Sequence, residues 1–192
     1  MIRRAALAAV ILLMLSTASA LAATKTVSIY NYYYAPTPVN VAMGGSVKWT
    51  NTTGTKHTVT SDAFFLWGTL TVNPHSTSSL AFPEAGTYLY HDSFHSTMHG
   101  KVKVPMRADA TVVSVGSSVT LTLGTAPPSG PVWHEVQARL NGGTWTTVAT
   151  TSANTTGFHP SAAGTWQLQT RLHHALSGAN TGWSPILTIT AN

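Results

Sequence analysis

The sequence predicts an all-β protein made of two small β-sandwiches in tandem. Only 8% of the 192 residues are charged, and Ser, Thr, Gly, Pro and Val are abundant, a balance that suits strands and turns. Short alternating segments recur along the chain with turn residues between them, as in sandwiches. This series of strand-like segments and turns is interrupted at residues 105–110 and then resumes. We therefore expect one sandwich over residues 24–105 and a second over residues 106–192.

The first half contains a series of segments with the pattern of strands. They are residues 25–30, 39–42, 46–50, 56–60, 70–72, 76–82, 88–91 and 100–104. The glycine pair at 44–45 and the run 83–86 supply turns between them. Because a sandwich brings strand ends together that are distant in sequence, loops from different parts of this half are expected to meet.

The second half has about seven expected strands in roughly eighty residues, as is typical of immunoglobulin-like and fibronectin type III-like sandwiches. The clearest are residues 110–115, 118–123, 132–140, 145–150, 164–171 and 186–190. Asn141-Gly142-Gly143 predicts a hairpin turn. The tryptophans of this half are expected in its core, and they are Trp133, Trp145, Trp166 and Trp183. Since fold alone does not define function, we expect this half to space or dock the first on a partner or the cell surface.

The N-terminus has the pattern of a secretory signal peptide. Arg3 and Arg4 precede an apolar run at residues 5–15, and small residues follow. We expect cleavage after Ala22 or Ala23, so that residues 1–23 are removed. The alternative, an uncleaved anchor, is disfavoured because the run is short for a span of about 20 residues. The protein is thus expected to be exported, to the periplasm or the cell exterior, with no membrane span after cleavage.

Composition excludes several functional classes. The formal charge of +5 is not gathered in any basic cluster once the leader is removed, so nucleic-acid binding is not expected. There is no cysteine, and therefore neither a disulfide framework nor a cysteine nucleophile. The five carboxylates form no pair placed for glycoside chemistry, and no Gly-rich phosphate loop occurs. We do not expect an enzyme.

One stretch, residues 86–104, concentrates metal-binding side chains. It reads as a strand, a short polar loop and a second strand, and the loop region holds His91, Asp92, His95, Met98 and His99. A mononuclear metal site arises when a few such side chains converge at one end of a sandwich. A distant histidine, His57, directly follows a strand and loop and is expected to complete the set. Trp49, Tyr90 and the phenylalanines would form an apolar wall around it.

Residues 24–105 resemble the cupredoxins, most closely the amicyanin and plastocyanin branch. The resemblance rests on residues 44–51 leading to His57, on Gly86-Thr87-Tyr88, on the loop 91–98 and on residues 100–104. It implies a Greek-key sandwich that binds one copper ion. His57 matches the first histidine ligand, His95 the second, and Met98 the weak axial ligand. The family's cysteine position is occupied here by Asp92.

The carboxylate at this position changes the expected chemistry. A thiolate is a soft ligand that gives blue copper sites their properties, whereas a carboxylate is hard, favours Cu(II) and would also accept Zn(II). The resemblance with this departure implies a weakly coloured, tetragonal Cu(II) site with slow electron transfer. Two alternatives stay open: a domain that has lost its metal, and a metal held instead by His91, His95 and His99.

Strand alternation places His91 on the face opposite Asp92, and His99 is expected at the solvent rim. His75 is expected at the surface, and a metal site in the second half is not expected, because neighbours such as His173 and His174 point to opposite faces.

Three functions follow from the sequence. The first is an exported protein that holds or delivers copper, in contact with a redox or copper-handling partner. The second is an electron carrier with an altered site. The third is a metal-free sandwich that mediates surface interactions.

Overall fold

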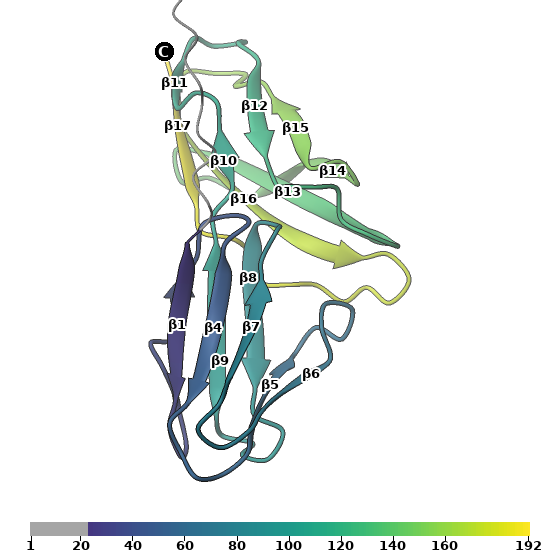
Figure 1. The fold of residues 1–192 in the computed structure, drawn as a ribbon. Coiled ribbons are helices and arrows are strands. Elements are labelled where there is room, and N and C mark those ends of the chain that lie inside the picture. Colours follow the sequence, from purple (N-terminus) through teal and green to yellow (C-terminus); the bar gives the residue numbers. More distant parts are fainter. Residues whose placement is uncertain (1–22) are drawn as a thin grey trace, which may run out of the picture.

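The computed structural model describes residues 23–192 (Figure 1). The predicted leader lies outside the described residues except for Ala23. Every regular element from residue 23 onward is a β-strand, which confirms the all-β prediction. No helix in this range is long and apolar enough to cross a membrane.

The first half forms two facing sheets, shown in purple to teal in Figure 1. The first sheet has the order β2-β1-β4-β7. Its strands are β1 (Thr24–Ile29), β2 (Tyr34–Ala35), β4 (Ser46–Asn51) and β7 (Thr77–Ala81). The second sheet has the order β3-β9-β8-β5-β6. Its strands are β3 (Val39–Asn40), β5 (His57–Ser61), β6 (Thr69–Val72), β8 (Gly86–His91) and β9 (His99–Val104).

The core between these sheets combines aliphatic side chains with a group of buried aromatic rings. Trp49 of β4 and Tyr90 of β8 are both fully buried and pack edge to face, with ring centroids 5.5 Å apart. Phe82 packs against the same tryptophan. Alternation in β4, where Val47 and Trp49 point inward, places these side chains in the core as expected. Trp49 and Tyr90 are therefore buried as expected, but Phe64 and Phe94 are exposed, and an apolar wall around the metal site stays a prediction.

The second half also consists of two sheets, and two of their strands, β13 and β16, are longer than any strand of the first half. A three-stranded sheet has the order β10-β12-β15, with β10 (Arg107–Ala108), β12 (Val119–Thr122) and β15 (Thr155–Phe158). A five-stranded sheet has the order β11-β17-β16-β13-β14. Its strands are β11 (Val112–Val113), β13 (Val132–Leu140), β14 (Thr146–Thr151), β16 (Gly164–His174) and β17 (Leu187–Ala191).

Two details of the second half differ from the sequence prediction. Strand β10 lies within residues 105–110, which had the pattern of a boundary, because Arg107 and Ala108 pair with β12. Strand β15 was not predicted; its Thr-Thr-Gly-Phe sequence is short and lacks an apolar alternation. It completes the three-stranded sheet through four register pairs with β12. The division of the chain at residue 105 stays a prediction.

The predicted core role of the second-half tryptophans holds only for Trp166, which is partly buried and packs against the hydrophobic core. Trp133 is 39% exposed, and neither Trp145 nor Trp183 belongs to the core. Two of them instead stack against guanidinium groups: Arg139 lies 4.5 Å from the Trp145 ring centroid and Arg171 lies 4.3 Å from that of Trp183. Large aromatic rings on the outer face of a sheet gain from covering such cations without entering the core.

The two halves are joined by backbone hydrogen bonds at the start of β8. Thr87 and Gly182 exchange both N–H···O bonds, at 2.9 and 2.8 Å, and the Ala85 N–H donates to the Leu123 carbonyl at 2.8 Å. Strands β8 and β9 pair Gly86 with Val104 at this end and His91 with His99 at the other. The loop 92–98 therefore lies at the end of the sheet opposite the junction (Figure 1).

Candidate metal centre

His57 is the first residue of β5 and is completely buried. The preceding loop is held by Asn51, whose side-chain amide donates to the carbonyls of Thr55, Val72 and Asn73 at 2.7–3.0 Å. The Asn51 Oδ1 atom accepts from the backbone N–H of Thr53 at 2.9 Å. A buried asparagine with all these partners fixes the loop rigidly. The imidazole that follows it is therefore placed with little freedom.

Asp92 directly follows β8 and is also completely buried. Its Oδ1 atom accepts hydrogen bonds from the backbone N–H of Phe94 at 2.9 Å and from the backbone N–H and hydroxyl of Thr58, each at 3.3 Å. Its Oδ2 atom faces two imidazoles, with the Nδ1 of His57 at 2.5 Å and the Nδ1 of His95 at 3.1 Å. Both carboxylate oxygens thus have protein partners.

His95 is carried by a loop folded into two consecutive turns. The His95 N–H donates to the Asp92 carbonyl at 3.2 Å, and the Met98 N–H donates to the His95 carbonyl at 2.9 Å. The Asp92 N–H donates to the Met98 carbonyl at 3.0 Å and closes the loop. The His95 side chain is 28% exposed, and Tyr32 packs edge-on against it with ring centroids 5.6 Å apart. His95 is therefore the solvent-facing member of the site.

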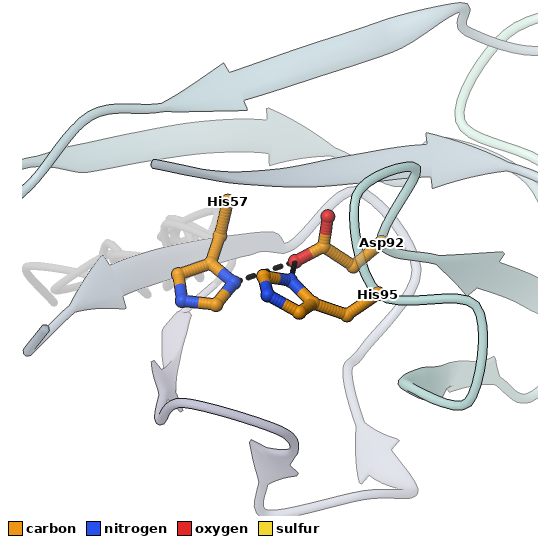
Figure 2. Close-up of side chains that lie close together, drawn as sticks. All are labelled: His57, Asp92 and His95. Atoms are coloured by element: carbon orange, nitrogen blue, oxygen red, sulfur yellow. Dashed lines mark hydrogen bonds and ion pairs between the residues drawn. The ribbon is translucent and has the colours of Figure 1, made fainter. Parts of the chain in front are cut away.

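These three side chains converge on one point. One nitrogen of each histidine and one oxygen of Asp92 all lie within 4.8 Å of one another. Figure 2 shows both imidazole rings directed at the same carboxylate oxygen, with a dashed line from each ring to it. The sequence predicted this convergence of His57, Asp92 and His95 from loops about 35 residues apart.

The charge state of Asp92 follows from its contacts. Burial raises the pKa of this carboxyl, but hydrogen bonds from the Phe94 N–H, His57 and His95 outweigh burial and bring the pKa below its ordinary value. The carboxylate is therefore ionised at neutral pH and acts only as an acceptor. Both Nδ1 atoms facing it must accordingly carry protons in the metal-free protein.

Met98, the predicted axial ligand, is 1% exposed and belongs to the buried core cluster. Its backbone closes the loop, as described above, and its thioether role stays a prediction. The alternative set of His91, His95 and His99 is not gathered by the fold. His91 contacts Asp62 on the outer face of the sheet, with Nδ1 2.6 Å from Oδ1, and His99 is exposed.

Several residues that build the site were not singled out from the sequence. The Thr55 hydroxyl lies 3.1 Å from His57 Nε2, and Thr58 contacts Asp92 through both its backbone and its hydroxyl. Threonines are common throughout this chain, so their presence alone does not single out Thr55 or Thr58 as site residues. The position of Thr55 two residues before His57 could have indicated its role, because a hydroxyl at this spacing can reach Nε2 of the imidazole ring.

The donor set fits a copper ion. Imidazole suits copper and zinc, and a carboxylate adds a hard anionic ligand. In metal sites the second nitrogen of a ligating histidine is usually oriented by a hydrogen bond, and Thr55 provides such a partner for His57.

Comparisons with known proteins identify the family of the first half of the chain. The model of the cupredoxin-like domain family matches residues 4–104. An amicyanin structure in its reduced Cu(I) form is 37% identical, over 41% of this chain and 79% of that chain, with a TM-score of 0.38. A purple cupredoxin from Nitrosopumilus maritimus is 26% identical, over 41% of this chain and 97% of that chain, with a TM-score of 0.38. No curated protein matches the chain.

Proposed function

We propose that this protein holds and delivers a single copper ion as Cu(II). The chain belongs to the cupredoxin-like domain family. Membership of this family supports copper binding or electron transfer as the kind of function. The ligands are His57 Nδ1, His95 Nδ1 and an oxygen of Asp92, with Met98 as a weak further ligand. The observation that carries the proposal is the gathering of these two imidazoles and one carboxylate within 4.8 Å at a mostly buried point.

In the metal-free protein, the two histidine nitrogens that would bind the metal carry protons. Each Nδ1–H donates to Asp92, so both protons must leave before the nitrogens can act as ligands. His57 has a way to accommodate this change, because its Nε2 lies 3.1 Å from the Thr55 hydroxyl. That hydroxyl donates to Nε2 in the metal-free state and accepts from Nε2–H once Nδ1 is a ligand. The same contact thus supports both states.

Asp92 decides the kind of copper site. It stands where the family carries its cysteine, and a carboxylate cannot supply the thiolate bond of a blue copper centre. The bound ion would favour the Cu(II) state and give a weakly coloured, non-blue site. Zn(II), which suits the same ligands, is the expected competitor.

The exposure of the ligands fits holding and delivery. His57 and Asp92 are sealed from solvent, whereas the His95 side chain is 28% exposed. Copper would therefore enter and leave past His95. The same exposed edge supports the second candidate function, electron transfer through an altered site. The metal-free alternative is supported by the complete hydrogen bonding of Asp92 in the absence of metal.

The setting proposed for this function is outside the cytoplasm. The N-terminal pattern of a basic pair followed by an apolar run supports export to the periplasm or the cell exterior. The second half, which we infer to be an immunoglobulin-like or fibronectin type III-like sandwich, would dock the copper half on a partner protein or the cell surface. We propose a binding protein and not an enzyme.

Copper titration followed by EPR and absorption spectroscopy tests the proposal. The wild type should bind one buried Cu(II) with a weak visible band, and both His57→Ala and Asp92→Ala should lose it. His75→Ala is the matched control, because His75 is exposed and lies outside the group formed by His57, Asp92 and His95. An intense blue-copper band would overturn the non-blue assignment. Equal binding by the wild type and a variant that combines His57→Ala with Asp92→Ala would favour the metal-free function. Reversible voltammetry at a physiological potential would favour the electron carrier.

A further inference from the structure

A second pair of histidines faces outward at the same end of the sheet. His91 ends β8 and His99 begins β9, and the two are direct partners in the antiparallel register. Directly opposite residues project from the same face of a sheet, and the ring centroids of this pair lie 6.2 Å apart. Because strand alternation reverses direction at each residue, this face is the one opposite the buried Asp92.

Each of these rings is oriented by a hydrogen bond to an acceptor. His91 Nδ1 lies 2.6 Å from Asp62 Oδ1, and His99 Nε2 lies 3.0 Å from the Ser96 carbonyl. An ionised carboxylate and a carbonyl can only accept, so Nδ1 of His91 and Nε2 of His99 carry the protons. In the neutral rings, His91 Nε2 and His99 Nδ1 therefore hold lone pairs.

These features are the ones that prepare histidines for a metal ion. A ligating imidazole usually donates its other N–H to a carboxylate or carbonyl, which fixes its tautomer and increases its basicity. His91 with Asp62 and His99 with Ser96 both show this arrangement. Two imidazoles bound at about 2.0–2.1 Å to one ion bring their ring centroids to roughly 5–6 Å. The observed centroid separation of 6.2 Å is close to this range.

We propose that His91 and His99 form a second, surface site for a divalent transition metal such as Cu(II) or Zn(II). The ligand atoms are His91 Nε2 and His99 Nδ1, water completes the coordination, and Asp62 orients His91. The site stands independently of the buried centre, because it shares no ligand with it. The two histidines flank the loop that carries Asp92 and His95, so an ion captured there is held beside the buried centre.

Calorimetric titration of the full chain with ZnCl₂ tests the proposal. The wild type should bind two ions, and the weaker one should be lost in both His91→Ala and His99→Ala. Asp62→Asn, which keeps both ligands, should weaken the same event by about 10- to 100-fold, the usual effect of removing such an orienting group. His75→Ala, an exposed histidine of the same half, should leave both events unchanged.

Two outcomes separate this proposal from that of the buried site. If the buried centre binds nothing, one zinc ion remains, and it is lost in His99→Ala but kept in His57→Ala. If the surface pair binds nothing, the remaining ion is lost in His57→Ala and kept in His99→Ala, and the proposal is overturned.

Discussion

Replacement of Asp92 by asparagine tests whether this carboxylate organises the metal-free site. The substitution preserves shape but removes the charge and one acceptor oxygen. In the wild type, Oδ1 serves the donors from Phe94 and Thr58, and Oδ2 serves His57 and His95. The single amide oxygen of asparagine can serve one of these groups but not both. The side-chain NH₂ of the asparagine, which is a donor, would then face either the donors of Phe94 and Thr58 or the two imidazoles.

The expected loss follows from the two histidine bonds. A hydrogen bond to a charged group contributes about 1.5–3 kcal/mol when buried. Part of this free energy is recovered if the His57 proton moves from Nδ1 to Nε2, because Nδ1 can then accept a hydrogen bond from the asparagine amide. We therefore expect Asp92→Asn to lower the free energy of unfolding of the metal-free protein by roughly 2–4 kcal/mol at pH 7.

Urea denaturation in the presence of EDTA measures this difference. The pKa of Asp92 is lowered in the folded state, so its charge stabilises the fold above the unfolded pKa of about 3.9. That contribution is lost as the pH falls through the lower folded pKa, and the gap between wild type and variant should shrink there. Asp109→Asn is the control, because Asp109 is solvent-exposed and its carboxylate accepts a hydrogen bond from Thr120 of β12, in the second half of the chain. Free energies of unfolding for Asp92→Asn and wild type that agree within about 0.5 kcal/mol at pH 7 would refute the reasoning.

Three further predictions concern single residues. Burial lowers the pKa of His134 to about 4, and both its ring nitrogens lack partners in the described part of the chain, so the native state keeps the ring neutral. The free energy of unfolding should therefore fall by about 3 kcal/mol between pH 6.5 and 4. Urea denaturation of His134→Leu should lack this part of the pH dependence. Gly100→Ala would place a methyl group 2.2 Å from the Tyr90 ring and should cost about 1–3 kcal/mol, read from thermal unfolding of the metal-free protein. Thr55→Val should keep the fold by circular dichroism but weaken Cu(II) binding about 10- to 100-fold, since it removes the partner of His57 Nε2.

The strands and the three central site residues were predictable because each depends on local pattern or on family spacing. Val47 and Trp49 alternate into the core as their sequence indicates. The spacing from Asp92 to His95 is short enough for one loop to carry both. His57 could be joined to them because a sandwich brings its loops together at each end.

The features that could not be predicted depend on contacts between segments. Strand β15 has no apolar alternation and is defined only by its pairing with β12. The outward stacking of Trp145 and Trp183 depends on arginines in other strands, and residue type alone pointed to the core. The pairing of His91 with Asp62 depends on the course of the chain after β5. Sequence spacing contains none of this information.

The carboxylate also explains why this site is complete without a metal. A thiol at the same position is a weak acceptor and would leave both imidazole N–H groups poorly satisfied. Asp92 accepts from both of them, and its second oxygen is held by the loop backbone. Polar groups buried without partners are costly, so a site that satisfies them in both states can lose its ion without losing its fold. The proposed release of copper needs this property more than a permanent redox centre would, and the hydrogen bonding of Asp92 provides it.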